Sequence, residues 1–461
     1  MSQQVGTGSS ASPASRRTSV LWSRDHRLTT VGLLLVVTLV AFEGMGVATA
    51  MPTLVAELHG LALYSWPFTT FLVASVVATV LSGRLGDRRG PAPALLAGPT
   101  LFGAGLIVAG TAPTMPVLLA GRALQGFGSG FLLVAVLLLI ALTFTDRERP
   151  VIYAANAAAW VLPAVLGPSI AGVVTVSVGW RWVFLGLVPL VTIGVALLVI
   201  VVRRLPHHVA EPSARRAGVL PAVAAALGVA ALTWAAQHPS PLASGYGAAG
   251  LVALAAALRN LLPKGTMTAR PGLPTVVASR ALLSGAYAGM EAYLPLTMSA
   301  VHGYGPALAG LPLTITALGW SAASALQGRF LDWSREATLR TGFTLVAVSL
   351  VGFGFVAQPW CPAWMAFVVC AIGGSGMGIG MPSISVLLLR YSPDGERGFN
   401  TSAMQLADWV GSALLIGLGG ALLAAVASAQ HPAPAMAILA AALVSLAVAG
   451  AALTSRWPPK V

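Results

Sequence analysis

Apolar residues run through most of this chain in long, nearly uninterrupted stretches. Each stretch is about 20 residues or longer and lacks the alternation of polar and apolar positions that a barrel strand needs, so each predicts a membrane-spanning helix. The pattern therefore predicts an all-α polytopic membrane protein with fourteen transmembrane helices. The expected spans are 29–52, 63–82, 92–112, 115–142, 151–176, 182–202, 218–236, 245–262, 273–299, 306–327, 340–357, 362–389, 400–427 and 432–454.

Composition supports this interpretation. Only 8% of the residues are charged and 57% are hydrophobic, whereas a soluble domain carries about 25% charged residues. The net charge of +13 could indicate a nucleic-acid partner. However, the arginines lie in short loops between apolar runs, where they orient membrane insertion. We therefore expect the lipid bilayer as a partner and no nucleic acid.

Positive charge is distributed unevenly between the two sides that alternating spans define. One side carries nearly all of the arginine and lysine residues of the loops, whereas the other side carries only Arg181. Loops rich in Arg and Lys face the cytoplasm. If any one span were absent, every later loop would move to the other side of the membrane and the basic loops would no longer share one side. We therefore expect an even number of spans, both termini in the cytoplasm, and a location in the inner (plasma) membrane. The basic loops are those with Arg84, Arg88 and Arg89; Arg147 and Arg149; Arg203 and Arg204; Lys264 and Arg270; Arg329 and Arg335; and Arg390 and Arg397.

A sequence pattern that follows the second span recurs after the tenth. Residues 83–88 read GRLGDR and residues 328–333 read GRFLDW. This spacing indicates two six-helix repeats, with the helix pair at 218–262 inserted between them, a plan used by many secondary transporters. The expected division is a disordered cytoplasmic N-terminus (1–28), a first six-helix bundle (29–203), a loop with two inserted helices (204–264), a second six-helix bundle (265–454) and a cytoplasmic tail (455–461).

Three motifs carry a resemblance to a known family. GRLGDRRG at 83–90 resembles the signature loop of the major facilitator superfamily, and LLAGRALQGFGSG at 118–130 resembles its helix-four motif. LGPSIAG at 166–172 resembles the helix-five motif of antiporters and supplies Gly167, Pro168 and Gly172, although Pro163 stands where glycine is usual. Fourteen spans and the sequence GWRWVF resemble the drug:proton antiporter branch. The resemblance implies the major facilitator fold and export by antiport.

Two charges inside the expected spans are predicted to pair. Each buried charge costs about 2.5–3.5 kcal/mol in the membrane, so it needs a partner or a cavity. Glu43 lies about 21 Å from the inner end of its span and Arg122 about 10 Å from the outer end of its own, at the rise of a helix. In an apolar core roughly 30 Å thick, the two are nearly level. The resemblance places both helices on the central cavity of the first half, so Glu43 and Arg122 are candidates for proton coupling or substrate binding. The alternative is a structural ion pair that never changes protonation.

Two further carboxylates, Glu291 and Asp408, have no cation at similar depth in their own spans. A carboxyl group in a medium of low dielectric takes up a proton more readily, so either residue is a candidate proton carrier. Histidine occurs only in the expected loops, which leaves proton coupling to carboxylates. The alternatives are that Glu291 contacts water near the outer mouth and that Asp408 only binds a neighbouring helix by a hydrogen bond.

Two more groups of residues are candidate functional sites. Trp160, Trp320 and Trp409 lie in mid-span, where they either pack or stack on planar and cationic ligands. The cytoplasmic motif is predicted to form a latch between the halves, since a carboxylate there can accept hydrogen bonds from the facing half. The latch residues are Gly83, Asp87, Arg88, Arg89 and Gly90, and those of its second-half repeat are Gly328, Arg329 and Asp332.

Together these features predict a secondary active transporter that exports small amphipathic or cationic compounds in exchange for protons, as in multidrug efflux and antibiotic resistance. The expected partners are a small-molecule substrate and protons, and the expected state is a monomer. One alternative is a transporter of a specific metabolite, lipid or peptide, including by uptake. Another is a non-transporting receptor or lipid-binding protein. Since the loops show no nucleophile–base set and no metal-ligand spacing, we expect neither an enzyme nor a metal or cofactor.

Overall fold

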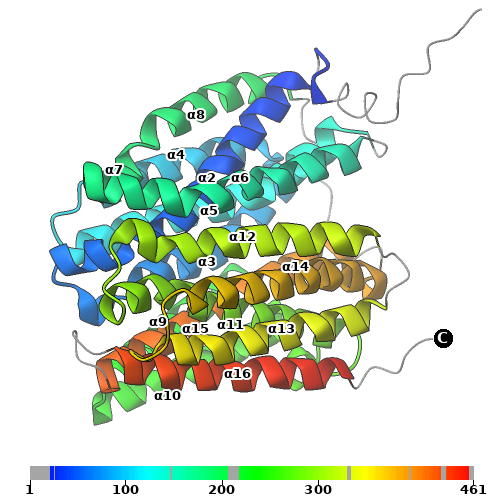
Figure 1. Cartoon of the computed structure of the whole chain (residues 1–461). Coiled ribbons are helices and arrows are strands. Elements are labelled where there is room, and N and C mark those ends of the chain that lie inside the picture. Colours follow the sequence, from blue (N-terminus) through cyan, green and yellow to red (C-terminus); the bar gives the residue numbers. More distant parts are fainter. Residues whose placement is uncertain are drawn as a thin grey trace, which may run out of the picture.

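The computed structural model describes residues 21–24, 26–145, 148–205, 218–329, 334–393, 396–426 and 432–455. Every regular element in these ranges is a helix, as the apolar pattern predicts (Figure 1). Most of the expected N-terminal segment, much of the 204–217 loop, Asp332 and most of the C-terminal tail lie outside the described residues.

The first bundle runs from α2 to α8, and the second runs from α11 to α16 (Figure 1). The inserted pair, α9 and α10, lies between them in the sequence. The first bundle comprises α2 (Arg27–Glu57), the short η1 (Leu61–Leu63), α3 (Trp66–Arg89), α4 (Ala92–Gly110), α5 (Met115–Thr143), α6 (Arg149–Ser177), α7 (Arg181–Leu185) and α8 (Val188–Val202). The remaining elements are α9 (Val219–Gln237), α10 (Pro241–Leu261), η2 (Thr266–Thr268), α11 (Leu273–Ala300), α12 (Pro306–Arg329), α13 (Arg335–Val356), α14 (Met365–Tyr391), α15 (Arg397–Val426) and α16 (Ala433–Ser455).

Thirteen described segments are long and apolar enough to cross a membrane, with α7 and α8 together forming one of them. The fourteenth expected span, α11, falls outside this group although it has 28 residues. It carries Arg280 and Glu291 and packs against α14, α15 and α16. Protein therefore surrounds most of α11, and its polar side chains need not face lipid.

Local sequence explains where several helices begin and end. Proline occupies the first turn of helices such as α3, α5, α6 and α11, where its missing N–H removes no helical hydrogen bond. The helix α3 continues beyond the expected span and ends at Gly90, which has a φ of 72° that favours glycine. The motif at 83–89 is therefore helical, and the prediction that it forms a loop was wrong.

Glycines bring the helices of each bundle into close contact, as their spacing predicts. A side-chain carbon at Gly128 would lie 2.5 Å from the backbone nitrogen of Phe102 in α4. At Gly130, two residues on, it would lie 2.7 Å from the carbonyl oxygen of Ser75 in α3. In the second bundle, Gly376 of α14 approaches α13 in the same way. The glycine-rich helices α5 and α14 thus make comparable close contacts, α5 with α3 and α4 and α14 with α13.

The two bundles meet along two seams. The helix α6 packs against α12, and α3 packs against α15. At the first seam, a side-chain carbon at Gly172 would lie 2.5 Å from the Cα atom of Ala307. We refer to the two ends of the molecule as the Tyr64 end, where α3 begins, and the Asp87 end, where α3 finishes.

Candidate functional site

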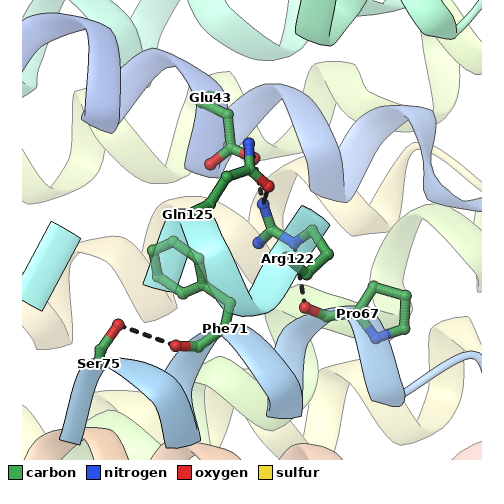
Figure 2. Close-up of polar contacts among 6 residues, drawn as sticks. All are labelled: Glu43, Pro67, Phe71, Ser75, Arg122 and Gln125. Atoms are coloured by element: carbon green, nitrogen blue, oxygen red, sulfur yellow. Dashed lines mark hydrogen bonds and ion pairs between the residues drawn. The ribbon is translucent and has the colours of Figure 1, made fainter. Parts of the chain in front are cut away.

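The predicted pair of Glu43 and Arg122 is confirmed. Glu43 projects from α2 and Arg122 from α5, and an Arg122 guanidinium nitrogen contacts Glu43 Oε1 (Figure 2). The two side chains are 0% and 3% exposed, respectively. Each charge thus has an opposite charge beside it, as burial in an apolar medium requires.

Gln125 completes this site, although sequence reasoning missed it. Its Nε2 donates to Glu43 Oε1 at 3.1 Å, and its Oε1 accepts from an Arg122 Nη atom at 2.9 Å. Arg122 Nε also donates to the carbonyl oxygen of Pro67 at 3.1 Å (Figure 2). The sequence did indicate this contact, because Gln125 follows Arg122 by three residues and both side chains therefore lie on one face of α5.

The second oxygen of Glu43 is unsatisfied. Glu43 Oε2 is buried and has no hydrogen-bond partner among the described residues. Leaving such an acceptor unpaired costs about 1–3 kcal/mol, and more when it carries charge. This oxygen is therefore the atom of the site best placed to gain a proton or a ligand donor.

An aromatic pair links this site to the other bundle. The guanidinium carbon of Arg122 lies 4.6 Å from the ring centroid of Phe71 in α3. The Phe71 ring meets Trp409 of α15 edge-on, with centroids 6.4 Å apart. Ser75 fixes this part of α3, because its hydroxyl donates to the carbonyl oxygens of Phe71 at 2.8 Å and of Gly126 at 3.0 Å.

Asp408 is not a lone carboxylate, and the contact observed is the stated alternative, a hydrogen bond to a neighbouring helix. Its Oδ2 accepts from Arg280 Nε at 3.0 Å and from an Arg280 Nη atom at 2.6 Å. Gln405 Nε2 lies 3.4 Å from the same oxygen. The cation belongs to α11, which packs against α15, and not to the helix that carries Asp408.

Glu291 differs from the other two carboxylates. Its side chain is half-buried, and no hydrogen bond or ion pair joins it to any residue within the described ranges. It lies near the Tyr64 end, because the hydroxyl of Tyr64 donates to the carbonyl oxygen of the next residue, Ala292, at 3.0 Å. Among the described residues, Glu291 thus has no arginine or lysine partner, whereas Asp408 is paired with Arg280.

The three candidate tryptophans occupy different surroundings. Trp160 is 40% exposed and lines a cavity of about 40 Å³ together with Asn156 and Ser129. The indole nitrogen of Trp409 is buried without a partner among the described residues. Trp320 packs its backbone against Gly378 of α14. Trp409 therefore has an unpaired indole N–H among the described residues, and Trp160 has an exposed ring. Trp320 lies at a close contact between α12 and α14.

The latch motif lies at the Asp87 end, at the C-terminal end of α3. A side-chain carbon at Gly83 would meet no atom of the described residues within 4 Å, so their packing does not require glycine there. Gly328 and Arg329 end α12, the equivalent helix of the second bundle. Of the antiporter motif, Pro168 is inside α6, Gly167 faces Met45 of α2 within the first bundle, and Gly172 faces α12 at the seam between α6 and α12.

Comparisons with known proteins agree with this architecture. Residues 33–416 match the family model of the Major Facilitator Superfamily. The chain is 26% identical to the MFS-type transporter ppz2 of Metarhizium majus over 412 residues, which cover 84% of this chain and 70% of that protein. It is 31% identical to the multidrug transporter protein MdtP of Bacillus subtilis over 174 residues, which cover 38% of this chain and 32% of that protein.

Among solved structures, an auto-inhibited POT family peptide transporter superposes with a TM-score of 0.70 and 16% identity. The match covers 93% of this chain and 98% of that structure. At this identity the likeness concerns the fold alone. The chain spans only about a third of the length of MdtP, so activity and cargo must be argued from the site.

Proposed function

Because the chain belongs to the major facilitator superfamily, we propose that it exports small amphipathic or cationic compounds in exchange for protons by alternating access. The observation that carries this proposal is the buried Glu43 carboxylate, which has one oxygen bound by Arg122 and Gln125 and the other without a partner in the part of the chain that the structure describes. Such a group has two stable arrangements, ionised and paired or protonated and released from the pair.

The chemistry of the exchange follows from these contacts. A proton that adds to Glu43 Oε2 neutralises the carboxylate and removes the charge that attracts Arg122. Arg122 then keeps the Pro67 carbonyl oxygen and the Phe71 ring as partners. A cationic cargo that binds near Glu43 favours the ionised carboxylate, so cargo and proton compete for the site. That competition is what couples their opposite movements.

The other carboxylates have separate proposed roles. Glu291 has no cation beside it within the described chain and is the second candidate for carrying a proton. Asp408 is held by Arg280 and acts as an ion pair that positions α11 against α15. Trp409 and Trp160 offer aromatic surface for a planar or cationic cargo, while Trp320 packs between helices.

Orientation and gating belong to the same proposal. The Asp87 end faces the cytoplasm, as the basic loops indicate, and Asp87, Arg88 and Arg89 form the latch with the end of α12. Support for a conformation closed toward the outside comes from the Tyr64 end. There Tyr64 of the first bundle stacks on Tyr293 of the second, with ring centroids 5.2 Å apart. The open position at Gly83 is consistent with a latch that forms in the other state.

Proton release from everted membrane vesicles tests the function. The vesicles are acidified inside, and the lumenal pH is followed with a dye while ethidium or tetraphenylphosphonium is added. We expect the lumen to become more alkaline with the wild-type protein and with Glu57→Gln, whose carboxylate binds Trp180 and Arg181 at the Tyr64 end. Glu43→Gln should abolish the response.

Two outcomes would redirect the proposal. If Glu43→Gln responds like the wild type while Glu291→Gln does not, Glu291 carries the proton. If no lipophilic cation changes the lumenal pH, multidrug export is wrong, and a narrow metabolite, lipid or peptide cargo becomes the working hypothesis.

A further inference from the structure

The inserted helices touch both bundles at the seam that must open during transport. The helix α9 packs against α3 of the first bundle and against α15 of the second, while α10 packs on α9 (Figure 1). Two close glycines join the inserted pair: a side-chain carbon at Gly228 would lie 2.8 Å from the carbonyl oxygen of Gly250. The pair is therefore tightly packed, and it cannot keep both of its neighbours when α3 and α15 separate.

The polar contacts of α9 join it to the first bundle. Gln237, the last residue of α9, donates from Nε2 to the hydroxyl of Ser65 at 2.9 Å. Its Oε1 accepts from the indole nitrogen of Trp66 at 2.7 Å. Ser65 and Gln237 are buried, where water cannot replace these bonds. Hydrogen bonds between membrane helices stabilise their association.

The contact of α9 with the second bundle is a surface of glycines. A side-chain carbon at Gly417 of α15 would lie 2.6 Å from the hydroxyl oxygen of Thr233. At Gly420 it would lie 2.7 Å from Gln237 Nε2. None of the hydrogen bonds within the described part of the chain joins α9 to α15. A smooth contact of this kind holds by van der Waals attraction alone and can shift without leaving a donor unpaired.

From this asymmetry we propose that the α9–α10 pair is bound to the first bundle through Gln237 and moves with it during transport. The glycine face of α15 parts from α9 when the Tyr64 end opens. The insert then continues to cover α3 along the seam, which limits the entry of lipid chains between the bundles. This inference rests on the proposed alternating access and adds the statement that only one of the two bundles carries the insert.

Distances between spin labels test which bundle carries the insert. Cysteines replace the exposed residues Ile107 on α4, Ser244 on α10 and Val351 on α13, taken two at a time. The background carries Cys361→Ala and Cys370→Ala, which removes the two native thiols. Pulsed electron paramagnetic resonance records the three distances in lipid nanodiscs at low and high pH, with and without tetraphenylphosphonium.

We expect the distance between α4 and α10 to stay constant while the distances from α13 to α10 and to α4 change together. A changing α4–α10 distance with a constant α10–α13 distance would overturn the inference and assign the insert to the second bundle. If all three distances stay constant under every condition, alternating access itself fails, and the proposed function fails with it.

A pair of variants tests the role assigned to Gln237. Gln237→Ala removes both hydrogen bonds to α3, so we expect a broader α4–α10 distance distribution. The control is His238→Ala, at the next residue, whose exposed ring stacks on Trp234 and makes no contact with α3 through a hydrogen bond. An unchanged distribution in Gln237→Ala would contradict the proposed attachment.

Discussion

Arg122 lies over the ring of Phe71, with its guanidinium carbon 4.6 Å from the ring centroid, while Glu43 contacts the same guanidinium group. The Arg122 cation therefore has two partners, the Glu43 carboxylate and the Phe71 ring, and only the first depends on protonation. The carboxylate partner is lost when it gains a proton, but the aromatic partner remains. Because Phe71 also meets Trp409 of the second bundle, this relationship connects the charge state of the first bundle to the seam between α3 and α15.

Replacing Phe71 by leucine is expected to move the pH dependence of exchange. The ring stabilises Arg122 most when Glu43 is protonated, and a desolvated cation–π contact contributes about 1–2 kcal/mol. Losing it disfavours the protonated state, so half-maximal exchange should shift to lower pH by about 0.7–1.4 units, given about 1.4 kcal/mol per unit. Lumenal alkalinisation measured across a pH series checks the shift.

The matched control for this prediction is Phe71→Tyr, which keeps the aromatic face and should keep the wild-type profile. A shift to higher pH in Phe71→Leu would contradict the argument, because it would mean that the ring favours the ionised state of Glu43.

Removing Arg122 alone should destabilise the protein strongly. Arg122→Met leaves Glu43 as an unpaired charge in an apolar medium, and breaking a buried pair in this way costs about 3–5 kcal/mol. The double variant Glu43→Leu with Arg122→Met removes both charges and should recover most of this loss. Thermal unfolding of the purified proteins in detergent measures both effects.

Transport separates this stability effect from function. The double variant should fold but show no proton release, since no carboxylate remains at the site. If the double variant released protons at the wild-type rate, Glu43 would be only a structural partner of Arg122, the alternative that the sequence had left open.

The depth of Glu43 and Arg122 could be predicted from the sequence because helical rise and membrane thickness fix the level of a residue within a span. Helical rise does not say which helices are neighbours. For that reason the contact of Arg280 with Asp408 was missed, as were Phe71 and the carbonyl oxygen of Pro67, which belong to a third helix. The glycines of α5 and α14 allow close contacts with neighbouring helices because backbone approach depends mainly on local side-chain size.

The end of α3 was misjudged for a related reason. Four charges within ten residues favour a loop in a membrane protein, yet the helix continues through Arg89. Charged residues are acceptable in a helix once it leaves the apolar layer, and basic side chains in the last turn interact favourably with the helix dipole. Hydropathy therefore locates the edge of the membrane, whereas the helix ends at Gly90, where φ becomes positive.

The latch proposal predicts that Gly83→Leu separates stability from transport. The first side-chain carbon at this position would meet no atom of the described residues within 4 Å in the present conformation, so the free energy of unfolding should change by less than about 1 kcal/mol. The same side chain would obstruct closure of the Asp87 end, and exchange should slow by about tenfold or more. The measurements are thermal unfolding and proton release at matched expression.

Gly126→Ala is the contrasting variant. A side-chain carbon there would lie 2.9 Å from Ala74 Cβ and would press on the α3 backbone, which should destabilise the protein by about 1–3 kcal/mol. A stable Gly83→Leu protein with wild-type exchange would remove the support for a latch at this end of α3.

Asp408→Asn should affect stability more than proton release. Asp408 and Arg280 are 15% and 17% exposed, so water compensates part of the loss, and we expect about 1–3 kcal/mol rather than the about 3–5 kcal/mol of a fully buried pair. Exchanging the two residues, as Arg280→Asp with Asp408→Arg, should restore stability because the pair is rebuilt between the same helices.

Proton release should persist in Asp408→Asn and in the exchanged variant while it is lost in Glu43→Gln. If Asp408→Asn instead abolished proton release and Glu43→Gln retained it, the second bundle would carry the proton, and the buried network around Arg122 would be a structural contact of the first.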